Sequence, residues 1–339
     1  MPALISPTDA GLYCQPAECH IDPWRPVARA LLTHAHADHA RPGSTQYICA
    51  EPSLALLRHR LGPEVHLQGV PYGERLSLGS AVVSFHPAGH VLGSAQIRIE
   101  AEGEVWVVSG DYKRATDPTC TPFEVVRCDT FVTEATYALP IFRWEPVARV
   151  AEEILAWWDA NRSAGRASVL FCYALGKAQR ILAELALLAD RTVFVHGAIE
   201  APTVCYRQAG ISMLPTHLVS ETAPGRAFGG ELVLAPLPAR GTRWMRRFGD
   251  AETGLASGAM AIRGARRRRG FDRGFVLSDH ADWPALLRTI EETGAQRVIT
   301  TVTYCEPLAQ FLRERGLAAE AWPTSVGAED DETGAQTRP

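Results

Sequence analysis

The first third of the chain consists of short apolar runs separated by turns. The runs at 95–99 and 105–108 alternate apolar and polar positions around Glu102 and Gly103, which predicts a β-hairpin. Runs of this length are typical of half-buried strands rather than helices. We therefore expect a β-rich region, with further strands at 30–33, 81–85 and 130–133.

Beyond Trp144 the apolar residues recur at helical spacing. Pro146 stands where a helix would begin, and the positions that follow it form one apolar face: Val147, Val150, Ile154, Leu155 and Trp158. Strands alternating with helices indicate a parallel α/β unit. The expected elements are strands at 168–172, 193–195 and 232–234, a helix at 176–189, then helix 282–293, strand 297–302 and helix 307–315.

Composition limits the kind of protein. With 339 residues, 46% hydrophobic and 21% charged, the chain is of ordinary globular type with room for about two domains. The formal net charge of -4 argues against affinity of the whole protein for nucleic acid, so a polyanion site has to be a local patch. The eight cysteines show neither zinc spacing nor a disulfide framework, and no leader or bilayer-spanning run is visible. We expect a cytoplasmic protein that binds no membrane.

The densest candidate chemistry is the run from His34 to His39, directly after the strand predicted at 30–33. Four metal-binding side chains packed this tightly cannot all reach one tetrahedral ion. Residues that alternate at a strand end point the same way, so His34 and His36 can share one ion while Asp38 and His39 turn toward a second. A solvated His-rich loop is the plain alternative, but this run is internal and follows an apolar strand. The run predicts a binuclear hydrolase.

Two further candidate ligands stand where predicted strands give way to loops. His90 follows the strand at 81–85, and Asp111 closes the strand at 105–108. Loops held by rigid strands position ligands well. Since no cysteine falls within these motifs, the ligand set is imidazole and carboxylate, which suits Zn²⁺ in a three-histidine site and Zn²⁺, Mn²⁺ or Mg²⁺ in a harder second site.

The order of these motifs resembles the metallo-β-lactamase superfamily: an Asp on an early strand, the His-x-His-x-Asp-His run, a lone His and a lone Asp. Asp22 would be the early acid, accepting a hydrogen bond that orients the His-rich loop; a turn residue before Pro23 is the plain alternative. The resemblance implies one ion on His34, His36 and His90, a second ion on Asp38 and His39, and Asp111 as the bridge between them.

Two later motifs extend the resemblance to the β-CASP nucleases, which cut DNA or RNA phosphodiesters, and it then covers nearly the whole chain. Glu134 matches their acid at a strand end, and His280 in Ser278-Asp279-His280 matches their histidine. Glu134 beside His280 would orient the imidazole and raise its pKa, which suits a general acid or a phosphate-binding cation. The implied fold is α/β, a metallo-β-lactamase αββα sandwich with an inserted β-CASP α/β cap domain. The expected bounds are 1–138 and 276–323 for the sandwich, 139–275 for the cap and 324–339 for a disordered tail.

The third β-CASP motif separates RNA-processing from DNA-processing members. Where the former carry a histidine that completes the second metal site, this chain has Val302, as do DNA-processing members of the Artemis kind. Val302 cannot ligate, so the resemblance implies two ions, Zn²⁺ and/or Mn²⁺, the second weakly bound.

Phrases at 21–27, 173–180 and 274–280 resemble the bacterial DNA ligase-associated exonucleases, although members of that group carry His-Gly in place of Val302 and Thr303. This resemblance implies 5′-to-3′ degradation of single-stranded DNA in repair, alongside an ATP-dependent DNA ligase and a helicase.

Local charge agrees with a nucleic-acid substrate. Ten arginines lie between Arg240 and Arg273, a dense positive strip on an otherwise acidic chain. A solvated surface loop is the alternative, and the interleaved Trp244, Phe248 and Phe271 would either stack bases or form core. The candidate DNA-binding residues are Arg266, Arg267, Arg268 and Arg269, Lys177 at a helix start, and Ser278.

We expect hydrolysis of a phosphodiester by metal-activated hydroxide. Asp38 would orient the nucleophile and His280 would steady or protonate the phosphate, with Glu134 and Asp22 in support. An RNA-processing β-CASP ribonuclease would share every metal ligand. A thioesterase or lactonase would need no cap, so the motifs at Glu134 and His280 disfavour it. A non-catalytic repair scaffold would not need an intact ligand set, so the intact ligands disfavour that alternative.

Overall fold

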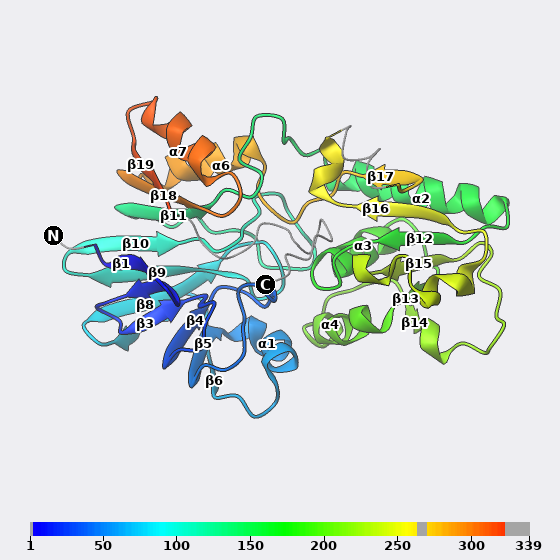
Figure 1. Cartoon of the computed structure of the whole chain (residues 1–339), viewed down its shortest axis with the longest axis horizontal. Coiled ribbons are helices and arrows are strands. Elements are labelled where there is room, and N and C mark those ends of the chain that lie inside the picture. Colours follow the sequence, from blue (N-terminus) through cyan, green and yellow to red (C-terminus); the bar gives the residue numbers. More distant parts are fainter. Residues whose placement is uncertain (1–2, 263–269, 323–339) are drawn as a thin grey trace. The chain divides into compact units, whose positions relative to one another are not determined.

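The computed structural model describes residues 3–262 and 270–322. Contacts divide the chain into two compact units, whose elements are labelled in Figure 1. Of the described residues, one unit contains those up to Phe142 and those from His280 to Trp322, and the other contains those from Arg143 to Asp279. The arginine run at 266–269 and the tail at 324–339, both singled out from the sequence, lie outside the described residues.

The first unit is built on two sheets whose inner faces share one apolar core. The core joins Leu31 and Ile48 of the first sheet to Phe85, Ile97 and Trp106 of the second. The six-stranded sheet has the order β1 (Ile5–Thr8), β2 (Gly11–Cys14), β3 (Cys19–Ile21), β4 (Arg29–Leu32), β5 (Gln46–Ala50), β6 (Leu67–Val70). The seven-stranded sheet has the order β19 (Ala318–Ala321), β18 (Arg297–Thr301), β11 (Thr130–Glu134), β10 (Glu104–Val108), β9 (Ala95–Ala101), β8 (Ala81–Pro87), β7 (Leu76–Leu78).

Helices cover the outer faces of these sheets. α6 (Trp283–Thr293) and α7 (Cys305–Arg313) pack on the seven-stranded sheet, where Leu286 and Leu308 meet Phe131. α1 (Leu54–Leu61) lies beside β6 of the other sheet (Figure 1). The layers are therefore helix, sheet, sheet, helix, which confirms the αββα sandwich.

The second unit is a parallel sheet with helices. Every described strand pairing in it is parallel, and the order is β14 (Thr216–Leu218), β13 (Val193–Val195), β15 (Leu232–Ala235), β12 (Ser168–Phe171), β16 (Glu252–Ala256), β17 (Arg273–Phe275). α2 (Val147–Ser163), α3 (Lys177–Ala186) and α4 (Gly197–Gln208) share an apolar core with this sheet. This is the α/β cap that the sequence predicted between the two parts of the sandwich.

Several local predictions are confirmed. β9 and β10 pair antiparallel, with Glu102 and Gly103 in the turn at positive φ. α2 begins directly after Pro146. The sequence pattern does not predict α1 or α4. α4 carries Pro202 within it, which weakens its helical pattern. Among the helices of the described part of the chain, none combines the length and apolarity needed to cross a membrane.

Candidate metal centre

Asp22 organises the His-rich loop from a strained backbone position. It follows β3 with φ of +43°, in the left-handed region. Its carboxylate accepts hydrogen bonds from the backbone N–H of Thr33 (2.8 Å), from Thr33 Oγ1 (2.5 Å) and from His39 Nδ1 (2.7 Å). The plain alternative of a simple turn residue does not account for these three bonds.

These bonds decide which nitrogen of two histidines carries the proton. Because an ionised carboxylate only accepts, His39 Nδ1 is the protonated nitrogen and Nε2 holds the lone pair. The Thr33 hydroxyl donates to Asp22 and so accepts from His34 Nδ1 at 3.0 Å. In both histidines Nδ1 is thus engaged by a hydrogen bond, and Nε2 is the nitrogen left to face a cation.

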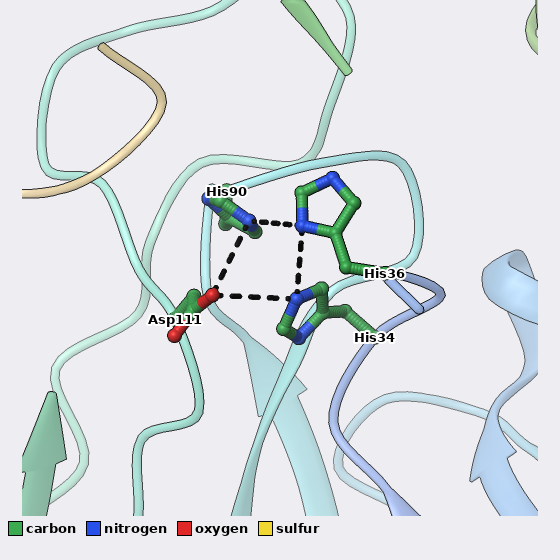
Figure 2. A group of neighbouring side chains, drawn as sticks. All are labelled: His34, His36, His90 and Asp111. Atoms are coloured by element: carbon green, nitrogen blue, oxygen red, sulfur yellow. Dashed lines mark hydrogen bonds and ion pairs between the residues drawn. The ribbon is translucent and has the colours of Figure 1, made fainter. Parts of the chain in front are cut away.

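The first ligand group brings together residues from three separate loops. Figure 2 shows His34, His36, His90 and Asp111 facing one another. His36 Nδ1 lies 3.2 Å from His34 Nε2 and 3.1 Å from His90 Nε2, and Asp111 Oδ2 lies 3.4 Å and 3.8 Å from the same two atoms. His34 and His90 are fully buried. Ring nitrogens converging on one carboxylate oxygen are a donor set that fits a divalent cation.

The second group shares Asp111 with the first. His39 Nε2 lies 3.4 Å from Asp111 Oδ2 and 3.7 Å from Asp38 Oδ2. This nitrogen is buried, and apart from these two carboxylate oxygens it has no polar partner among the described residues. A bound cation would satisfy both the nitrogen and the carboxylates. The clusters are consistent with a binuclear metal site, and Asp111 faces histidines of both groups.

Burial and charge oppose each other within the cluster. Burial, helped by the neighbouring His39, holds the pKa of His34 well below its usual value. Burial alone would also lower the pKa of His39, but the carboxylates of Asp111, Asp38 and Asp22 outweigh it and raise that pKa well above usual. For Asp111, burial would raise the pKa, and the His39 ring outweighs it and holds the pKa well below the usual range. The site attracts positive charge.

Glu134 and His280 lie against this cluster in the same unit. Glu134 ends β11, is 2% exposed, and accepts from the Tyr112 N–H at 2.7 Å through Oε1. Its Oε2 accepts from His280 Nδ1 at 2.8 Å. The His280 ring centroid is 4.7 Å from that of His90. The two residues expected to act as a pair are thus brought together beside the ligands.

Val302 adopts an unusual backbone conformation. β18 ends at Thr301, and Val302 follows with φ of +67°, a genuine outlier for a β-branched residue. It lines a small cavity of about 40 Å³ together with His39, Asp111 and Glu134. Position 302 thus lines the same cavity as His39 and Asp111 of the second ligand group.

The DNA-binding candidates of the second unit have different surroundings. Lys177 opens α3 but is 1% exposed, with Nζ 3.8 Å from Asp279 Oδ2. Ser278 is also buried, and its carbonyl accepts from Arg180 Nη1 at 2.7 Å. The sequence gives no sign that Arg180 has a structural role, because its partners Ser278 and Asp279 lie about a hundred residues away. Arg266 to Arg269 fall outside the described residues.

Most of the described arginines of the strip are exposed, and Arg247 is half-buried. Arg243 and Arg246 are exposed, and Arg240 stacks over Phe271 with its guanidinium carbon 4.0 Å from the ring centroid. Phe248 is buried. Trp244 is half-buried against it, with ring centroids 4.6 Å apart. Phe248 therefore belongs to the core rather than to a stacking surface.

Comparison with known proteins identifies several that are similar to this chain in sequence. No family model matches the chain. It is 33% identical over 318 residues, 92% of its length, to a protein of Opitutus terrae named as a probable DNA ligase, and covers 30% of that protein. It is 31% identical to Ribonuclease TTHA0252 of Thermus thermophilus (46% of this chain, 42% of the relative) and 26% identical to an RNase J-like protein of Methanocaldococcus jannaschii (40% and 34%). The chain thus spans less than half the length of these relatives.

A solved structure shares the fold. A protein of unknown function from Enterococcus faecalis V583 superposes with a TM-score of 0.58 at 12% identity, covering 88% of this chain and 80% of that one. Fold and site define an α/β protein with a metallo-β-lactamase sandwich, a β-CASP-type insertion and a buried His/Asp cluster. This fold is the one that the sequence resemblance implied.

Proposed function

We propose that this chain is a metal-dependent nuclease that hydrolyses DNA phosphodiesters. The observation that carries the proposal is the convergence on Asp111 of the imidazoles of His34, His39 and His90, with the Glu134–His280 pair alongside. Two bound ions would lower the pKa of a water nucleophile and neutralise charge on the attacked phosphate. His34, His36 and His90 would hold one ion, Asp38 and His39 the other, with Asp111 shared.

The protein's own groups would supply orientation and proton transfer. Asp38 is partly exposed, so its carboxylate can accept a hydrogen bond from the attacking water. His280, held at Nδ1 by Glu134, keeps Nε2 to donate to a phosphate oxygen or to the leaving group. Asp22 keeps the loop histidines in the cation-binding tautomer. We propose Zn²⁺ and/or Mn²⁺ as the ions, the second more weakly held because Val302 offers no ligand.

DNA as the substrate, single-stranded and degraded from the 5′ end, is supported by Val302 and by the long match to a relative named as a probable DNA ligase. That match also supports a role beside an ATP-dependent DNA ligase, and we propose a helicase as a further partner in repair. An RNA-processing nuclease is the second candidate, favoured by the relatives named as ribonucleases.

Metal-titrated digestion separates these candidates. The substrates are 5′- and 3′-labelled single-stranded DNA and RNA of one sequence, with and without a 5′ phosphate. We expect mononucleotide release from the 5′ end of DNA only when Zn²⁺ or Mn²⁺ is present. Preferential cleavage of RNA would select the second candidate, and no cleavage of either polymer at any metal concentration would overturn the nuclease proposal.

A further inference from the structure

A long loop carries Asp111 without support from regular structure. β10 ends at Val108 and β11 begins at Thr130, and residues 109–129 between them form neither helix nor strand. Loops longer than about 12–15 residues in a compact domain are usually functional. No regular ladder runs through this loop, so individual contacts set the position of Asp111, among them the hydrogen bonds from the Tyr112 N–H to Glu134 and from the Lys113 N–H to the Ala88 carbonyl.

A buried ion pair is a further contact within this loop. Lys113 Nζ bonds Asp117 Oδ2, and the two side chains are 1% and 3% exposed. Asp117 Oδ1 also accepts from the N–H (2.8 Å) and the hydroxyl (2.6 Å) of Thr119. A buried ion pair adds little net stability compared with apolar residues of similar size, because both charges lose their hydration. Stability alone therefore does not explain its presence.

The ion pair lies at the junction of two ligand-bearing loops. Lys113 is two residues from Asp111, and its N–H donates to the carbonyl of Ala88 at 3.0 Å, two residues before His90. Between them, Gly89 has φ of +71°, and a Cβ there would lie 2.5 Å from the Lys113 carbonyl oxygen. The loops interlock at this point, and His90 Nε2 faces Asp111 Oδ2 across 3.8 Å.

We propose that Lys113 and Asp117 are positioning residues that fix Asp111 against His90 and so set the metal affinity of the site. The inference rests on the proposed function, since it presumes that the cluster binds metal. If the ion pair only stabilised the fold, a neutral pair that restores folding would also restore metal binding. If the ion pair positions the ligands, a neutral pair would restore folding but would not restore metal binding.

The test compares Lys113→Met with the double variant Lys113→Met/Asp117→Asn. The single variant leaves a buried carboxylate unpaired, whereas the double variant is neutral and its Asn oxygen still accepts from Thr119. Co²⁺ is the probe: its dissociation constant is measured by competition with a chelator, its visible spectrum reports ligand geometry, and metal-free melting reports folding. Arg166→Met, which disrupts the Arg166–Glu252 ion pair of the other unit, is the control for metal affinity.

We expect both Lys113 variants to bind Co²⁺ about 10- to 100-fold more weakly with an altered spectrum, while the double variant melts near the wild-type temperature and the control keeps wild-type affinity. Wild-type affinity and spectrum in the double variant would overturn the positioning role and leave the proposed function standing. A wild-type protein that binds no Co²⁺ would overturn both.

Discussion

The His/Asp cluster of the first unit and the arginine strip of the second are both candidate functional regions, but they are built differently. In the cluster, side chains from loops after β3, β4, β8 and β10 are buried and bonded to one another across long sequence separations. In the strip, the exposed Arg243 and Arg246 follow each other along one short helical segment, η4 (Arg243–Phe248). Chemistry in the cluster depends on geometry to within tenths of an ångström, whereas the strip needs only charge density. Substitutions should therefore act on rate in the first region and on affinity in the second.

Asp111→Ala should produce the largest loss, because this carboxylate is shared by both ligand groups. We expect kcat to fall about 1,000-fold or more, since several kcal/mol of charge stabilisation are lost, with bound metal reduced and metal-free melting little changed. Assays of nuclease rate, metal content and melting check this. Asp250→Ala, at a side chain that is 93% exposed, is the control. A wild-type rate in metal-replete buffer would remove Asp111 from the centre.

His280→Ala should follow, with a fall in kcat of about 100-fold and little change in KM, as for loss of a general acid. Glu134→Gln should cost less, and the double variant should be no slower than His280→Ala, because Glu134 acts through His280. The surface pair His86–Glu124 in the same unit, 3.1 Å apart, provides matched controls. Additive losses in the double variant would show that Glu134 acts independently.

Arg243→Gln/Arg246→Gln should change affinity alone. We expect KM for single-stranded DNA to rise several-fold at unchanged kcat, and the slope of log Kd against log salt to fall by about 0.7 for each lost phosphate contact. Arg149→Gln/Arg288→Gln removes the same charge at other exposed helical sites. Equal behaviour of the two double variants would mean that only net charge matters and that the strip is a solvated surface.

Val302→His should produce the smallest change in rate and a measurable change in metal binding. Histidine tolerates positive φ better than valine and would add a nitrogen at the cavity that holds His39. We expect the second Mn²⁺ to bind about tenfold tighter, against no change in Val302→Ile, as titrated by electron paramagnetic resonance. Unaltered Mn²⁺ binding in Val302→His would separate this position from the second site.

The sequence predicts the ligand-bearing parts of the fold well because each ligand follows a strand with an unambiguous apolar run. β4, β8 and β10 were expected for that reason, and the loops after them carry His34, His90 and Asp111. The contacts that hold these loops cannot be predicted in the same way. Asp117 gives no periodic signal, and the Lys113 N–H meets the Ala88 carbonyl only after folding.

Position 302 shows the same limit at one residue. The apolar pattern predicts a strand through 302, and the strand pairing does run to Thr301. The sequence does not predict the left-handed conformation at Val302, because valine does not favour positive φ. Local pattern predicts elements, whereas strain at their ends is imposed by the surrounding structure.

Asp22 has a consequence for how this centre would fail. One carboxylate sets the tautomer of His39 directly and of His34 through a threonine hydroxyl. A substitution at Asp22 would let both rings change tautomer. The metal affinity of both ligand groups would then fall together, rather than that of one group alone. Asp22, which is not among the proposed ligands, would thus affect both ligand groups at once.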